Sequence, residues 1–155
     1  MRRRESHTRV ALDGMPLASQ QLCSIAEYHG LWSHPFDPDD HIRISAPEPR
    51  PGDPGLIESG NYAVLVNGKV LYGRRELTER VILDNRADFT YHVDAEGFWQ
   101  MHRMAPEVLA GTALKEIADA GADKARVIWD LYSGSGLFTL PIAALYPHAE
   151  ILSVE

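Results

Sequence analysis

Residues 127–155 constrain the fold of this chain more than any other segment. They contain a β-branched strand at 127–131, a glycine turn at 133–136, a helical segment at 137–146 and a second strand at 151–154. This order predicts one βαβ unit, in which the helix connects two parallel strands. One such unit cannot complete a doubly wound sheet, so we interpret the chain as a fragment of a longer protein.

The turn at 133–136 has the features of a nucleotide-binding loop. Gly134 and Gly136 let the backbone approach a ligand closely and adopt a positive φ angle. The start of the following helix offers unpaired N–H groups and the positive end of the helix dipole. Glu155 follows about 20 residues later, where a carboxylate can accept hydrogen bonds from both hydroxyls of a ribose. Alternatively, the glycines serve only to pack the helix against the strand.

Thr139 distinguishes between two kinds of nucleotide site. Dinucleotide-binding folds use the pattern G-x-G-x-x-G, and Thr139 occupies the position of the third glycine. Residues 128–132 suit a ligand that ends in an amino acid rather than in a pyrophosphate. The pattern therefore favours S-adenosyl-L-methionine (SAM), and a dinucleotide-dependent oxidoreductase is the less favoured alternative.

The middle of the chain predicts antiparallel strands. Asn67-Gly68 separates two apolar runs and is typical of a type I′ hairpin, because both residues tolerate positive φ. A second hairpin joins residues 79–83 to residues 89–93, and the alternating segment 41–45 adds a strand. We expect these strands to form one small, mostly antiparallel sheet.

Two helices are predicted from the residues at their ends. The first covers residues 16–29, with Pro16 in its first turn and Gly30 just past its end. The second covers residues 106–120 and begins with Pro106.

Composition and charge exclude several classes of protein. The longest apolar run, residues 137–146, is far shorter than the ~20 residues of a membrane span. No apolar segment follows the N-terminal arginines, so we predict no secretory signal, no membrane association and a cytoplasmic protein. The net charge of -7 opposes a strong nucleic-acid footprint on this part of the protein. The single cysteine and the scattered histidines predict no metal site.

Residues 129–138 resemble the first SAM motif of the RNA uracil-5-methyltransferases, which form 5-methyluridine in tRNA and ribosomal RNA. That motif reads Asp-Leu-Tyr-Cys-Gly-x-Gly, and Ser133 replaces its cysteine here. Residues 98–102, Phe-Trp-Gln-Met-His, resemble the aromatic-aromatic-Gln segment that precedes the motif, in a form similar to actinobacterial members. The resemblance is good over residues 60–155 and looser over residues 1–60.

The resemblance implies six cofactor-binding residues: Gln100, Tyr132, Gly134, Gly136, Leu137 and Glu155. The glutamine and the tyrosine match residues that contact SAM, and the two glycines form the turn beneath its methionine end. The leucine matches a contact position whose identity varies in the family, and the glutamate matches the acid that binds the ribose.

The resemblance also implies the domain organisation. Residues 1–95 would form a central domain with a small antiparallel sheet and a helix. Residues 96–155 would form the incomplete start of a Rossmann-like SAM-binding methyltransferase domain, with a helix and its first βαβ unit. The expected fold class is therefore α/β in this second part and α+β overall.

The family's chemistry is expected outside this chain. Its members use a cysteine thiolate that adds to uracil C6 and a carboxylate that removes the C5 proton. Both follow later strands, so we predict no catalytic residue here and an inactive fragment. Cys23 lies in a different context and is interpreted as a buried apolar residue.

Two questions of partnership stay open at this stage. The parent enzyme would bind RNA, either tRNA or ribosomal RNA. The RNA phosphates are possible contacts of Arg2, Arg3 and Arg4, and the alternative is that these arginines form a solvated terminus. An incomplete sheet exposes a strand edge and an apolar face. The fragment could therefore form homo-oligomers, and a non-catalytic binding or dimerisation module is the alternative function.

Overall fold

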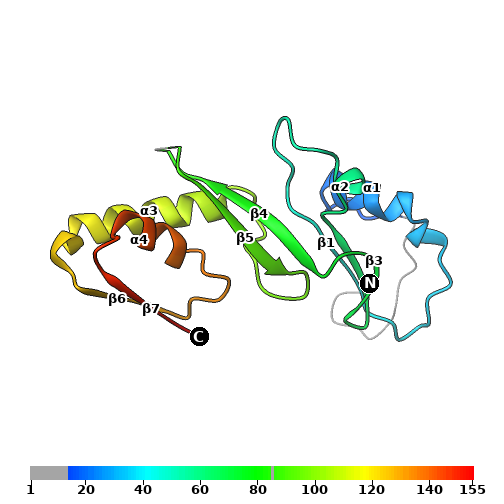
Figure 1. The fold of residues 1–155 in the computed structure, drawn as a ribbon. Helices are drawn as coiled ribbons and strands as arrows, with labels where there is room; N and C mark the ends of the chain where they lie inside the picture. Colours follow the sequence, from blue (N-terminus) through cyan, green and yellow to red (C-terminus); the bar gives the residue numbers. More distant parts are fainter. Residues whose placement is uncertain (1–13, 85) are drawn as a thin grey trace. The chain divides into compact units, whose positions relative to one another are not determined.

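The computed structural model describes residues 14–84 and 86–155 (Figure 1). The hypotheses on Arg2, Arg3 and Arg4 lie outside these residues. The chain divides into two compact units, Met1–Arg75 and Glu76–Glu155, which we describe separately. In the part of the chain that is described, no helix has both the length and the apolar character needed to cross a membrane.

The first unit contains a three-stranded antiparallel sheet in the order β1-β2-β3. Its elements are α1 (Gln20–Tyr28), a 3-10 turn (Leu31–Ser33), β1 (Ile42–Ser45), α2 (Leu56–Ser59), β2 (Ala63–Val66) and β3 (Lys69–Gly73). The predicted hairpin turn is confirmed, because Asn67 and Gly68 have φ angles of 50° and 76°. The predicted strand at 41–45 is also confirmed as β1, which begins one residue later, and the backbone N–H of His41 just before it donates to the Asn67 side chain.

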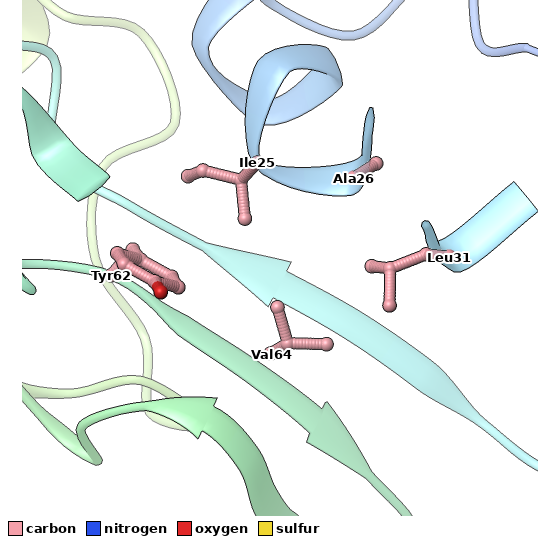
Figure 2. Packing of buried hydrophobic residues seen from close by; sticks show 5 residues of the cluster. All are labelled: Ile25, Ala26, Leu31, Tyr62 and Val64. Atoms are coloured by element: carbon pink, nitrogen blue, oxygen red, sulfur yellow. The ribbon is translucent and has the colours of Figure 1, made fainter. Parts of the chain in front are cut away.

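The core of the first unit lies between α1 and one face of this sheet (Figure 2). Ile25 and Ala26 from α1 and Leu31 from the 3-10 turn pack with Tyr62 and Val64. Full burial of an Ile, Leu or Val side chain contributes ~1.5–3 kcal/mol, so Ile25, Leu31 and Val64 stabilise the packing of α1 on the sheet.

The first helix is present as predicted, but it begins at Gln20 and not at residue 16. The hydroxyl of Ser19 accepts a hydrogen bond from the N–H of Leu22 and caps α1, so the helix starts at Gln20 rather than in the turn that contains Pro16. The helix end agrees with the prediction, since Gly30 is left-handed with φ of 62°.

The second unit begins with a hairpin and ends with the βαβ unit. Its elements are β4 (Glu76–Ile82), β5 (Asp88–Asp94), α3 (Ala105–Asp119), a 3-10 turn (Ala122–Lys124), β6 (Val127–Leu131), α4 (Thr139–Leu145) and β7 (Glu150–Val154). Strands β6 and β7 are parallel, with Val127 opposite Glu150 and Leu131 opposite Val154. The predicted βαβ unit and the mixed, α+β fold class are therefore confirmed.

The expectation of one antiparallel sheet is wrong, because β4 and β5 form a sheet of their own. The chain leaves the first sheet at Gly73, which has φ of 77°, and the N–H of Arg74 then bonds to the carbonyl of Tyr62. A Cβ on Gly73 would lie 2.0 Å from that same carbonyl oxygen, so this exit requires glycine. The domain boundary between residues 95 and 96 stays a prediction, since compact units within one chain do not define the domains of a longer protein.

One apolar face of the sheet of the βαβ unit is exposed among the residues that the structure describes. Val127, Trp129 and Leu131 alternate with better covered residues along β6, and Trp129 is 62% exposed. Val154, opposite Leu131, is exposed on the same side. We call these four residues the open sheet face. Parallel sheets are normally covered on both faces, so this surface is unusual for a finished domain.

Candidate SAM-binding turn

The predicted turn lies at the carboxyl ends of two parallel strands. It follows β6, and the N–H of Ser133 donates to the carbonyl of Val154 in β7 over 3.2 Å. The N–H of Gly136 donates back to the carbonyl of Ser133 over 2.9 Å and closes the turn. This edge of a parallel sheet is where ligands bind in open α/β folds.

Three residues of the turn adopt left-handed backbone conformations. Tyr132, Gly134 and Gly136 have φ angles of 59°, 52° and 78°. A left-handed tyrosine costs on the order of 1–3 kcal/mol, and the side chain of Tyr132 is 92% exposed, so apolar burial does not offset this cost. Residues held in such conformations cluster at binding sites.

The glycines of the turn are not required by packing. A Cβ on Gly134 would meet no described atom within 4 Å, and one on Gly136 would make only ordinary contacts of 3.8 Å with Thr139. The alternative in which they serve only to pack the helix therefore does not fit. Their left-handed conformation explains the glycines, and the space beside Gly134 is open within the described chain.

Helix α4 is shorter than predicted and begins two residues later. It covers Thr139–Leu145, whereas the predicted helix covers residues 137–146. Leu137, one of the six predicted site residues, is buried, and its carbonyl accepts a hydrogen bond from the hydroxyl of Tyr91 over 3.0 Å. A contact of Leu137 with a ligand would therefore involve its main chain.

Gln100 and Glu155 belong to segments that are bonded to the turn through other residues. The hydroxyl of Ser135 donates to the carbonyl of Phe98 over 3.4 Å, which brings the segment before α3 to the turn. Gln100 belongs to that irregular segment and is half-buried. Glu155 directly follows β7 and is exposed.

A buried carboxylate lies under the turn. Asp130 in β6 is 7% exposed, and the hydroxyl of Thr139 donates a hydrogen bond to it. The hydroxyl oxygens of Thr139 and Ser153 are 3.5 Å apart. In the sequence, Thr139 stands out only as the residue in place of a third glycine. Its interaction with Asp130 was missed, because it depends on how α4 packs against β6 and β7.

Comparison with curated proteins finds related sequences. A protein from Bifidobacterium longum named as an uncharacterized RNA methyltransferase is 48% identical over 162 aligned positions, which cover 100% of this chain and 36% of the relative. Over its whole length, the chain is therefore similar to one part of a protein with this name. A similarly named protein from Corynebacterium efficiens is 38% identical over 81% of the chain and 30% of its own length. One from Bdellovibrio bacteriovorus is 44% identical over 40% of the chain and 15% of its length.

The chain spans about a third of the length of the Bifidobacterium relative, 36% by alignment. No family model matches the chain, and no solved structure matches it.

Two further expectations concern Cys23 and a metal site. Cys23 is half-buried on α1 and contacts the carbonyl of Met15 over 3.7 Å, so its expected full burial is wrong. Within residues 14–84 and 86–155, no group of three or more histidine, cysteine or acidic side chains is arranged to hold a metal ion.

Tyr91 makes the stability of the second unit depend on pH. Burial raises the pKa of its hydroxyl from 10.0 to about 12. The hydroxyl therefore favours folding below pH 10, and this contribution is lost as the pH rises through about 12, by about 2–3 kcal/mol in total. Tyr91→Phe has no hydroxyl to ionise, so the difference in free energy of unfolding between wild type and this variant should shrink as the pH rises from 10 to about 12. Urea unfolding at a series of pH values measures this difference.

Tyr146→Phe is the matched control for this experiment. Tyr146 is also buried, but its hydroxyl has no hydrogen-bond partner among the described residues. At neutral pH, Tyr91→Phe should cost about 1–2 kcal/mol, because it leaves the carbonyl of Leu137 without its donor, whereas Tyr146→Phe should cost little. Equal costs for both variants would contradict the hydrogen bond to Leu137.

Proposed function

We propose that the protein to which this chain belongs transfers a methyl group from SAM to C5 of uridine in tRNA or ribosomal RNA. The observation that carries the proposal is the open, left-handed turn at 132–136, at the ends of two parallel strands, in a chain whose relatives are named as RNA methyltransferases. RNA modification of this kind is consistent with a cytoplasmic protein.

The residues present fit a SAM molecule across the turn. Gly134 leaves room for close approach, and Tyr132 presents an exposed ring beside it. Glu155 offers a carboxylate beyond β7 for the ribose hydroxyls, and Gln100 approaches from the segment that Ser135 contacts through Phe98. Bound SAM supplies an electrophilic methyl group, and the main chain at Leu137 completes the proposed set.

The choice of uridine C5 is supported by the sequence resemblance. Residues 98–102 and 129–138 resemble the two segments that precede and form the SAM motif of the uracil-5-methyltransferases. The nucleophilic cysteine of that chemistry is proposed to lie outside this chain, because Cys23 lies far upstream of the turn, in a sequence context that does not match the family's nucleophile.

A chimera tests the proposal. In the chimera, this chain replaces the segment of the Bifidobacterium relative that aligns with it, and the alignment includes the whole of this chain. We expect the chimera to transfer labelled methyl groups from SAM to unmodified RNA and nuclease digestion to release 5-methyluridine. The isolated chain and its Cys23→Ser variant should transfer none. Methyl groups on another base would refute the uridine specificity, and transfer by the isolated chain would refute the assignment of the nucleophile.

The open sheet face favours one alternative function, a non-catalytic module that binds another chain. Its exposed Trp129 and Leu131 provide the kind of apolar surface that protein partners cover. A chimera that folds but binds no SAM, together with a tight, saturable dimer of the isolated chain, would favour this module over the enzyme.

A further inference from the structure

We infer that Thr139 is a positioning residue for the turn that the proposed function assigns to SAM. Its hydroxyl holds the carboxylate of Asp130 and thereby fixes the start of α4 against the end of β6. The inference rests on the proposed function for its consequence in catalysis, but its structural part stands on the contacts below.

Asp130 requires a partner because of its burial. Among the described residues, Asp130 is the one charged residue that is buried, with 7% exposure. A buried carboxylate without hydrogen bonds is costly, and Thr139 supplies one. The helix start itself does not use this hydroxyl, since Phe138 precedes α4 and no described side chain caps it.

The direction of the hydrogen bonds follows from the chemistry of the hydroxyl group. Thr139 has one hydroxyl proton, and it donates that proton to Asp130. In its contact with Ser153, Thr139 can therefore only accept, so Ser153 is the donor over 3.5 Å. The order Ser153, Thr139, Asp130 links β7, α4 and β6 through three side chains.

This link closes a short loop that contains the whole turn. Asp130 immediately precedes the segment and Thr139 immediately follows it, so residues 131–138 lie between two bonded side chains. A left-handed Tyr132 persists only where its surroundings over-determine the backbone. The bond between Asp130 and Thr139 restricts this loop at its base, and the hydrogen bonds of Ser133 to Val154 and of Tyr91 to Leu137 restrict it further along.

The chimera separates positioning from stability. Thr139→Val keeps the branched shape but removes the donor, and we expect the KM for SAM to rise roughly tenfold, the loss typical of a hydrogen bond to a charged group. The kcat should change less than about twofold, because the hydroxyl is not assigned to the reacting atoms. Thr139→Ser should restore the KM. Thr112→Val, at an exposed position of α3, is the control for a threonine-to-valine change.

Amide exchange in the isolated chain tests the structural part without any enzyme assay. Thr139→Val should speed exchange at the N–H groups of Ser133 and Gly136, which close the turn, and Thr112→Val should not. Unchanged exchange at both amides would overturn the inference. So would an unchanged KM in an active Thr139→Val chimera, whereas an unsubstituted chimera that neither binds SAM nor methylates RNA would overturn the proposed function alone.

Discussion

Replacement of Gly134 by valine is expected to weaken SAM binding to the chimera by more than about a hundredfold. Gly134 has φ of 52°, which a β-branched residue adopts only at a cost of about 1–3 kcal/mol. The new side chain would also occupy the open space beside the turn where SAM is proposed to lie. Titration calorimetry of both proteins measures the change in affinity directly.

Gly121→Val is the matched control for this substitution. Gly121 is also left-handed, with φ of 78° and open surroundings among the described residues, but it lies between α3 and the following 3-10 turn. Both variants should lose similar stability, and only Gly134→Val should lose affinity.

Glu155→Ala should weaken SAM binding by ~1.5–3 kcal/mol, less than Gly134→Val does, because it removes hydrogen bonds to a charged group. Glu150→Ala, at the start of β7, is its control and should leave the affinity unchanged. Unchanged affinity in both Gly134→Val and Glu155→Ala would mean that the turn is only structural.

The second large effect concerns the open sheet face. The isolated chain is expected to self-associate as its concentration rises, because exposed apolar surface costs ~25 cal/mol per Å² and a second copy can cover it. Lysine at both Trp129 and Leu131 should return the chain to a monomer in sedimentation velocity. Leu17→Lys is the control, because Leu17 is equally apolar and highly exposed but lies in the first unit.

Two results would contradict a role of the open sheet face in association. One is a wild-type chain that remains monomeric at all concentrations and shows slow amide exchange throughout β6. The other is association that persists unchanged in the double lysine variant, since this would place the contact elsewhere.

Local sequence signals predicted the elements whose conformation depends on neighbouring residues. Asn67-Gly68 predicted its hairpin because its positive φ angles are a property of the turn itself. Strand β6 was predicted at its observed bounds, because a short β-branched run between turn residues has few other conformations. The start of α1 was missed because Ser19 and Pro16 offer competing signals, and the serine side chain makes the cap.

Interactions between distant segments could not be predicted in the same way. The separation of β4 and β5 from the first sheet depends on where the chain leaves β3, at Gly73. The alternation of β5 indicates that Tyr91 faces a core, but not that its hydroxyl meets the carbonyl of Leu137. The bond between Thr139 and Asp130 likewise depends on how α4 packs at the ends of β6 and β7.

The hairpin of β4 and β5 is connected to the end of the turn, because the hydroxyl of Tyr91 bonds to the carbonyl of Leu137 across 46 positions of sequence. Glu107 at the start of α3 also accepts the N–H of Ile82 at the end of β4. A shortened protein that begins at residue 96 would lose both anchors and leave Leu137 with an unpaired carbonyl. The boundary between Arg75 and Glu76 is the better place to cut the chain or to insert foreign sequence, because both residues are exposed and a cut there keeps the hairpin with the turn.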